Sequence, residues 1–271
     1  MRHGIHFISG LPRSGSTLLA AILRQNPTLH ADITSPVGSL FLVLRREMGA
    51  VNETSVNITD DQRQAVLRGL FDNFYCTVHP HRTIIDTNRS WCAQLATIAA
   101  LFPDARVIAC VRHVPWVLDS IETLIQKNLW QTSKIFDFET GGTTWSRVDR
   151  LATANGMVGF AWNALKQAFY GNEASRMMLL RYETLTRDPA AALTAVYGFL
   201  NLPPFDHDFN NVTFTANEFD ARLGTPRLHS VGREVHAVAR ETVLPPDLWR
   251  RFENDSFWRD PALNPRGVTI V

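Results

Sequence analysis

Short runs of hydrophobic residues alternate along the chain with segments whose hydrophobic residues recur at helical spacing. Four nearly continuous hydrophobic runs, at residues 5–9, 82–86, 106–111 and 176–181, predict buried strands. Helical spacing predicts helices over residues 16–25, 62–76, 91–101, 114–127, 157–170 and 189–200. Buried strands that alternate with helices indicate βαβ units, so we expect an α/β fold with a mostly parallel sheet and helices on both faces.

This pattern weakens in two stretches of the chain. After about residue 204 the sequence consists of short polar and aromatic pieces with several prolines, and only residues 246–254 favour a helix. We expect this C-terminal part to wrap around the sheet. Residues 134–150, which include Gly141 and Gly142, predict a long loop of the kind that often covers a site. No repeat or linker interrupts the chain, so residues 1–271 are expected to form one domain.

Composition and charge narrow the classes of partner. The chain has 271 residues with 27 basic and 26 acidic side chains, a formal charge of +1, so we expect neither a nucleic acid nor a membrane surface as partner. No hydrophobic run reaches the roughly 18–20 residues of a membrane helix, and the N-terminus lacks a secretory signal pattern. Cys76, Cys92 and Cys110 show no metal or disulfide spacing, which favours reduced thiols and a cytoplasmic protein. The oligomeric state stays open, with a homodimer as one option.

The strongest chemical signal is the segment GLPRSGST, residues 10–17, between the first strand and the first helix. In such a loop the backbone N–H groups and the positive end of the helix can hold a phosphate. A Walker A loop would carry a lysine where this chain has Ser16, and the cation here is Arg13 instead. An arginine fork suits a planar or trigonal group of oxygens. The alternative interpretation is a turn that only joins strand to helix.

A second candidate phosphate site follows the third predicted strand. Arg112 closes that strand, and Ser120 lies eight residues later in the next helix. The carboxyl edge of a parallel sheet is where ligands bind in open α/β folds, so both side chains could reach one anion. Taken alone, Arg112 is more typical of a surface ion pair and Ser120 of a neutral helix position, but together with the first loop they favour a second anion site.

These segments resemble a known family. GLPRSGSTLL and VRHVPWVLDSIETL are similar to the two nucleotide-binding signatures of sulfotransferases that use 3′-phosphoadenosine 5′-phosphosulfate, PAPS. LFPDARVIACVRHVPWVLDS and LLRYETLTRDPAAALTAVYGFLNLP resemble the tyrosylprotein sulfotransferases and their bacterial relatives, and the likeness spans roughly residues 5–235. The resemblance implies the sulfotransferase fold, PAPS as co-substrate, a hydroxyl-bearing acceptor and no metal ion.

The resemblance also assigns residues to the donor. The 3′-phosphate would be held by Arg112 and Ser120, and Tyr182 would contact the nucleotide. The loop at residues 224–233 would close over it, with Ser230 and Arg233 as the contacts. The 5′-phosphosulfate would be held by Arg13, Ser14, Gly15, Ser16 and Thr17.

The chain departs from the tyrosylprotein enzymes at two positions that bear on catalysis. Their glutamate base falls in a stretch where this chain offers only Asp32, and the lysine after their second strand is missing, with Arg89 as a substitute. Sulfuryl transfer needs an in-line acceptor and stabilisation of the leaving oxygen, which we assign to Arg13, the helix N-terminus and Ser16 or Thr17.

The base that deprotonates the acceptor is open among three residues, Asp86, Asp32 and His113, and the two aspartates lead. Each also has a structural interpretation: Asp86 as a capping residue, Asp32 as a turn residue and His113 as a packed histidine.

Three functions are compatible with these features. The leading hypothesis is a sulfotransferase that moves the sulfuryl group of PAPS to a tyrosine or to a small-molecule or carbohydrate alcohol and releases PAP. The second is a P-loop phosphotransferase or nucleoside triphosphatase in which Asp86 binds magnesium, although the loop lacks its lysine. The third is a non-catalytic nucleotide-binding protein, which the absence of a clear glutamate base keeps open.

Overall fold

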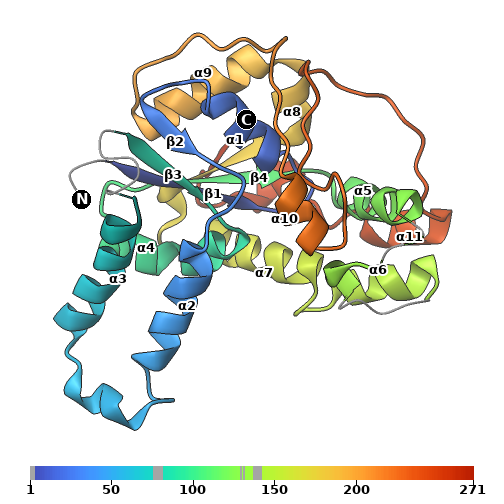
Figure 1. Ribbon diagram of the computed structural model, residues 1–271. Helices are drawn as coiled ribbons and strands as arrows, with labels where there is room; N and C mark the ends of the chain where they lie inside the picture. Colours follow the sequence, from blue (N-terminus) through green and yellow to red (C-terminus); the bar gives the residue numbers. More distant parts are fainter. Residues whose placement is uncertain (1–3, 76–81, 129, 131, 137–141) are drawn as a thin grey trace.

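The hydrophobic runs predicted as strands lie side by side in one sheet. The computed structural model describes residues 4–75, 82–128, 130, 132–136 and 142–271. Its six-stranded sheet has the order β2-β3-β1-β4-β5-β6, and every adjacent pair of strands is parallel (Figure 1). The strands are β1 (Ile5–Gly10), β2 (Leu29–Ala31), β3 (Thr83–Thr87), β4 (Val107–Val111), β5 (Met177–Arg181) and β6 (Thr269–Ile270). The expected α/β class is confirmed.

Helices connect the strands and cover the sheet. Proline stands in the first turn of α5, α9 and α11, where its missing N–H costs no hydrogen bond. A 3-10 helix at Arg89–Gln94 precedes α4, so the helix predicted over 91–101 is half 3-10 and half α. The helices are α1 (Ser16–Leu23), α2 (Val37–Glu47), α3 (Asp60–Tyr75), α4 (Leu95–Leu101), α5 (Val114–Lys127), α6 (Thr144–Ala152), α7 (Met157–Tyr170), α8 (Tyr182–Arg187), α9 (Pro189–Leu200), α10 (Asn217–Arg222) and α11 (Pro246–Phe252).

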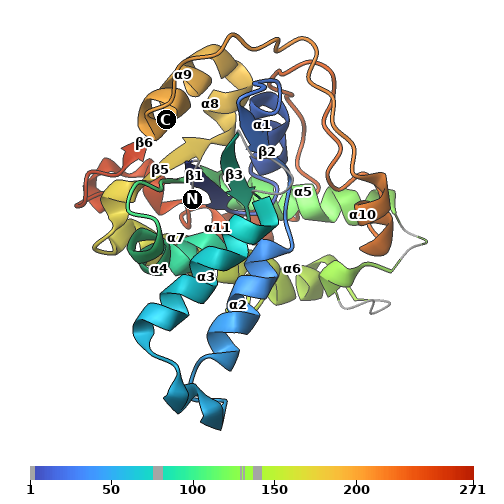
Figure 2. The ribbon, with the colours of Figure 1, turned by 60° about the vertical axis from the view of Figure 1, so that its left-hand side comes forward.

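The strands send alternate side chains into two hydrophobic cores. Ile8 of β1 packs into a core with α1 and α9, whereas its neighbour Phe7 packs into a core built from α2 to α7 and α11. An aromatic cluster of Phe7, Phe41, Phe71 and Trp91 joins α2 and α3 to the sheet, with ring centroids 5.1 to 6.0 Å apart. Figures 1 and 2 show α1, α8 and α9 on one side of the sheet and α4 and α7 on the other.

The order of the strands creates a crevice at the carboxyl edge of the sheet. From β1 the chain passes to the edge strand β2 and returns to β3 beside β1, and it then places β4, β5 and β6 on the other side of β1. In open α/β sheets such a switch point is where ligands bind. Gly10 ends β1 there, with φ of 107°, and a Cβ at this position would lie 2.1 Å from the carbonyl oxygen of Cys110. Glycine therefore lets the loop after β1 approach the end of β4.

Some elements lie outside the predicted ones. Strands β2 and β6 are short, and α10 has only six residues. Helix α2 carries exposed hydrophobic residues, so its hydrophobic positions do not follow a clear helical period. Helix α6 occupies part of the predicted loop 134–150, where Thr143 and Ser146 form a capping box at its start. Residues 137–141 of that loop lie outside the described residues. Helices α2 and α3 project from the body of the molecule as a pair (Figure 2).

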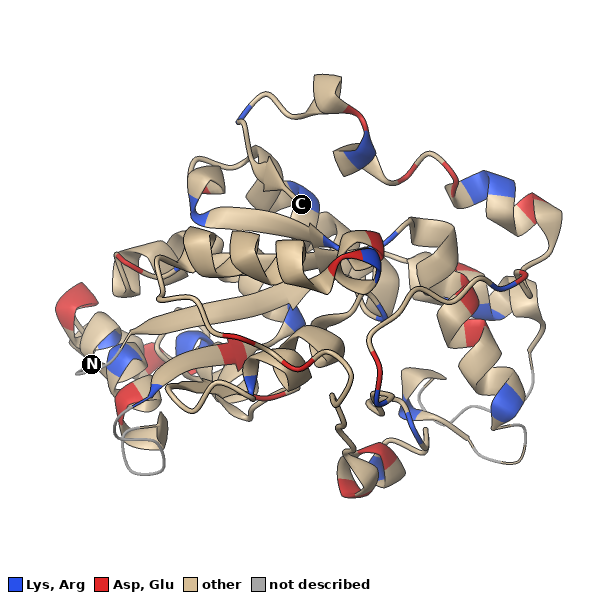
Figure 3. Ribbon diagram, turned by 90° about the horizontal axis from the view of Figure 1, so that it is seen from above, with Lys and Arg blue, Asp and Glu red and all other residues tan. Residues whose placement is uncertain are grey.

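The distribution of charge agrees with the balanced composition. Basic and acidic residues are scattered over helices and connecting segments (Figure 3). Among the described helices, none has both the length and the apolar character that a bilayer crossing requires. Cys92 and Cys110 are buried free thiols, and Cys76 lies outside the described residues.

Candidate functional site

A cavity of about 1000 Å³ opens at the carboxyl edge of the sheet. It is lined by the loop after β1, the ends of β3 and β4, one face of α5, the start of α8 and the segment from residue 219 to residue 240. Among the described lining residues one is acidic, Glu234, and six are cationic: Arg13, Arg89, Arg112, Lys127, Lys134 and Arg240. This excess of positive charge suits an anionic ligand.

The loop between β1 and α1 has the geometry of an anion cradle. Gly15 is the N-cap of α1 with φ of 94°, and no side chain caps the first turn of this helix. The N–H groups there have no partner within the helix, and Ser16 and Thr17 line the cavity beside them. A Cβ at Gly15 would lie 3.1 Å from the ring of Tyr182, so the glycine also lets α8 pack close to the loop.

Arg13 ties this loop to two other parts of the cavity. It adopts the left-handed conformation with φ of 58°, which is uncommon for a residue with a side chain. Its Nε donates to Ser120 Oγ at 3.1 Å, and its Nη1 donates to the carbonyl oxygen of Leu228. Burial lowers the pKa of Arg13, and the nearby cation of Arg112 acts in the same direction. An arginine stays charged despite such shifts, so the site holds a desolvated cation.

One N–H group of Arg112 has no hydrogen-bond partner. Its guanidinium lies 4.2 Å from the ring centroid of Tyr182 and 6.0 Å from that of Trp116. Its Nε is buried and has no hydrogen-bond partner. An unpaired buried donor costs about 1–3 kcal/mol, so this N–H fits a ligand oxygen. A smaller cavity of about 250 Å³ shares Arg112, Tyr182 and Arg240 with the large one and continues it.

Arg240 was not found by sequence reasoning. Its guanidinium lies 5.1 Å from the ring centroid of Trp116, forms an ion pair with Asp119 and donates to Thr123 Oγ1 at 3.1 Å. The Oδ1 atom of buried Asp119 also accepts from Thr242 Oγ1 at 2.8 Å and from the Val243 N–H at 2.7 Å. These bonds hold the C-terminal segment across α5. The partners are more than a hundred residues apart in the sequence, so no local pattern could reveal them.

Most of the residues assigned to the donor line the cavity. Two do not: Ser14 is buried with its Oγ donating to the Pro12 carbonyl oxygen at 3.3 Å, and Arg233 is exposed. The assigned residues that line the cavity are Arg13, Gly15, Ser16, Thr17, Arg112, Ser120, Tyr182 and Ser230.

Asp86, the first candidate base, is not brought to the cavity. Its side chain is 1% exposed. Its Oδ2 accepts from Ser35 Oγ at 2.5 Å and from Tyr75 Oη, and its Oδ1 accepts from Trp91 Nε1 at 2.7 Å. Burial raises the pKa of Asp86. With three donors and no access to the cavity, this carboxyl group joins α2, α3 and β3, and it has no free oxygen for a substrate proton or for magnesium.

The other two candidate bases also lie outside the lining residues. Asp32 accepts from the N–H of its neighbour Ile33 at 2.8 Å, as expected of a turn residue. His113 Nε2 donates to the Glu253 carbonyl oxygen at 3.0 Å, and its ring lies 5.8 Å from that of Trp249. Both side chains therefore have structural partners away from the cavity.

The cavity instead contains a histidine held by an aspartate. His229 Nδ1 lies 2.6 Å from Oδ1 of Asp220, and the His229 backbone N–H donates to Oδ2 at 2.9 Å. Because a carboxylate accepts, Nδ1 carries the proton and Nε2 is left as the acceptor of the neutral ring. Burial lowers the pKa of His229, whereas the hydrogen bond that it donates to Asp220 raises it. Neither residue belongs to a periodic stretch of sequence, so only the structure identifies the pair.

The described residues contain no group of three or more His, Cys, Asp or Glu side chains arranged to hold a metal ion.

Comparison with known proteins identifies the family. A sequence model of the sulfotransferase family matches residues 6–207. The fold is similar to that of the sulfotransferase domain from the curacin biosynthetic pathway, with a TM-score of 0.51, 19% identity and 75% of each chain covered. It is also similar to that of a sulfotransferase from Alicyclobacillus acidocaldarius, with a TM-score of 0.50, 15% identity and coverage of 93% of this chain and 90% of that one. No curated protein matches the sequence. The family match spans most of the chain, and the protein therefore belongs to the sulfotransferase family.

Proposed function

We propose that this protein transfers the sulfuryl group of PAPS to a hydroxyl group of an acceptor and releases PAP. The observation that carries the proposal is Arg112, whose buried Nε lacks a partner at the switch point of the sheet. Membership of the sulfotransferase family supports the reaction class. The missing loop lysine and the engaged carboxyl group of Asp86 favour this function over a magnesium-dependent triphosphatase.

The residues present fit the two anionic ends of the donor. The first turn of α1, with Ser16 and Thr17, would hold the 5′-phosphosulfate through backbone N–H groups and hydroxyls. Arg112 would hold the 3′-phosphate through its free N–H, and the Tyr182 ring beside it would contact the nucleotide. When bound, PAPS would supply the sulfuryl group, and the leaving group PAP would take the electron pair of the broken S–O bond.

Two further roles follow from the geometry. Arg13 and the first turn of α1 would stabilise negative charge on the leaving phosphate oxygen. His229 would accept the proton of the acceptor hydroxyl at Nε2, with Asp220 fixing the ring and stabilising its protonated form. This arrangement is the reason that we propose His229 as the base, in place of the three candidates from the sequence.

Calorimetric titration with PAP, and separately with ATP and magnesium, tests the donor site. We expect metal-independent PAP binding, weakened by about 1.5–3 kcal/mol in Arg13→Ala and in Arg112→Ala, because each removes a charged contact. Arg259→Ala is the matched control, since Arg259 is exposed and does not line the cavity. Binding of magnesium and ATP without binding of PAP would contradict the proposal.

A further inference from the structure

We infer that the acceptor is an alcohol with an apolar body and an anionic group at its far end, which Lys127 and Lys134 bind. This inference rests on the proposed function and names the class of acceptor. Both lysines line the cavity, and Lys127 stands in the last turn of α5, at the end of that helix farther from Arg112.

Helix α5 sets the distance between the reacting end and the far end. Ser120, Leu124 and Lys127 lie on one face of α5, and all three line the cavity. Ser120 accepts from Arg13 and so marks the donor end. Lys127 lies seven residues further, which is about 10 Å along a helix that rises about 1.5 Å per residue. An acceptor whose hydroxyl is at the donor end thus extends along α5 toward Lys127.

Lys134 lines the same cavity from another element. It begins the 3-10 helix Lys134–Phe136, and its backbone N–H donates to the Leu223 carbonyl oxygen at 3.0 Å. This bond holds the start of the short helix against the end of α10. Ile135 and Leu223 line the cavity next to it. Each lysine therefore lines the cavity next to aliphatic residues, Leu124 beside Lys127 on α5 and Ile135 and Leu223 beside Lys134.

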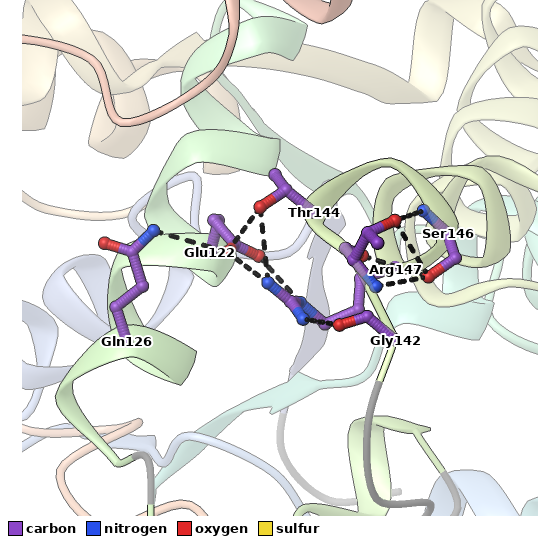
Figure 4. Close-up of polar contacts among 7 residues, drawn as sticks. Glu122, Gln126, Gly142, Thr144, Ser146 and Arg147 are labelled. Carbon is purple, nitrogen blue, oxygen red and sulfur yellow. Dashed lines mark hydrogen bonds and ion pairs between the residues drawn. The ribbon is translucent and has the colours of Figure 1, made fainter.

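The carboxylates of α5 do not neutralise these cations. Helix α5 has two, Asp119 and Glu122. Asp119 is paired with Arg240, as described above. Glu122 is 2% exposed and accepts from Nε of Arg147 at 3.0 Å and from Nη2 at 2.5 Å, with Thr144 and Gln126 as further donors (Figure 4). Both acids thus serve other contacts.

Within the part of the chain that the structure describes, neither Lys127 nor Lys134 has an ion-pair partner. Glu234, the acidic lining residue, lies on the C-terminal segment and is exposed. The chain contains three lysines, and two of them line this cavity.

The third lysine, Lys166 of α7, lies 4.6 Å from the ring centroid of Trp162 and does not line the cavity. Lysine binds carboxylate or phosphate as a point charge, so either group fits.

The test compares ligands that differ only in charge. Calorimetry would measure binding of ω-hydroxyoctanoate, of ω-hydroxyoctyl phosphate and of the neutral diol of the same length, each with and without PAP. We expect the anionic alcohols to bind about tenfold more tightly than the diol, and added salt to reduce the difference because both lysines are exposed. Which of the two anionic alcohols binds more tightly shows whether the acceptor carries a carboxylate or a phosphate.

Variants assign the preference to the two lysines. Lys127→Gln and Lys134→Gln should each reduce it several-fold, and the double variant should bind the anionic alcohols no better than the diol. Lys166→Gln is the matched control and should keep the full preference. Equal binding of anionic and neutral alcohols by the wild type, or an unchanged preference in the double variant, would overturn the inference.

Failure of the proposed function has a different signature. If PAP does not bind and no sulfated product forms, the donor assignment fails, yet a preference that depends on both lysines still supports the anionic ligand. If PAP binds and the preference is absent, the acceptor class is wrong and the donor assignment stands.

Discussion

At the scale of single residues, the pair of His229 and Asp220 carries the clearest prediction about catalysis. His229→Asn should reduce kcat by about 10²- to 10⁴-fold, because it removes the proton acceptor, while PAP affinity stays near that of the wild type. His236→Asn is the matched control, since this exposed histidine also lines the cavity. Equal loss of activity in both variants would contradict a specific role for His229. Steady-state kinetics and PAP titration make the comparison.

The same pair predicts a pH dependence. Burial lowers the pKa of His229 from its ordinary value of 6.5, so the neutral, proton-accepting ring predominates at neutral pH. Activity should therefore rise with pH through a value below 6.5 and then level off. The hydrogen bond that His229 donates to Asp220 raises this pKa, so Asp220→Asn should move the rise in activity to lower pH. The same substitution should also reduce kcat, because the ring loses its orientation. A profile identical in wild type and Asp220→Asn would count against the pair.

Sequence reasoning at this scale selected Arg13 and Arg112, which line the cavity, but did not select His229, the residue that we propose as the base. Arg13 and Arg112 stand in loops next to predicted strand ends, so their positions follow from strand–loop–helix spacing. Asp86 has the same kind of position, but its side chain points into a core where Ser35, Tyr75 and Trp91 donate to it. The direction of a side chain at a strand end depends on tertiary packing, which spacing alone does not report.

At the scale of elements, strand β1 carries a test of the fold through His6. The side chain is 7% exposed, and its Nδ1 accepts from the Arg106 N–H at 3.2 Å, which requires an unprotonated nitrogen. Burial, with a contribution from Arg106, lowers the pKa of His6 from 6.5 to about 4. Between these values the unfolded chain binds more protons than the folded one. The free energy of unfolding should therefore fall as pH decreases from about 6.5 to about 4, by about 3 kcal/mol from this residue.

Urea unfolding at a series of pH values measures this dependence. His6→Gln should be less stable at neutral pH but should lose less stability than the wild type on acidification, because it has no group that titrates at this position. His236→Gln should keep the full pH dependence of the wild type, since His236 is exposed. If the wild type and His6→Gln lost equal stability on acidification, folding would not lower the pKa of His6, and the prediction would be wrong.

Elements with a continuous pattern were predicted well, and elements with a local or polar pattern were not. Strands β1, β3, β4 and β5 are buried on both faces, so their hydrophobic runs are uninterrupted. Helix α6 buries Val148 and Leu151 at helical spacing, but it has only nine residues, and its start is set by a capping box and its position by the bond from Arg147 to Glu122. Strands β2 and β6 are too short for any period to be recognised.

At the scale of the whole molecule, the cavity is assembled from parts of the chain between residues 9 and 240. Arg13 bonds to Ser120 and to Leu228, and Arg240 bonds to α5, so the bonds around the cavity join three distant segments. The sequence predicted a C-terminal part that wraps around the sheet, and the family resemblance pointed there to Ser230, which lines the cavity, and to Arg233, which does not. Nothing in the sequence indicated His229 or Arg240. Only the long-range contacts of the folded chain bring these residues to the cavity.

This assembly predicts how the donor product affects stability. PAP would contact the loop after β1, the end of β4 and α8, none of which keeps its arrangement in the unfolded chain. At a PAP concentration one hundred times Kd, the free energy of unfolding should rise by about 2.7 kcal/mol. Scanning calorimetry should show one transition that moves as a whole, because the sheet and the C-terminal segment are joined through Arg240 and Asp119. Arg112→Ala should show a smaller shift at the same PAP concentration, because its Kd is higher. Two transitions, of which PAP moves only one, would instead show that the donor site and the rest of the chain unfold as separate units.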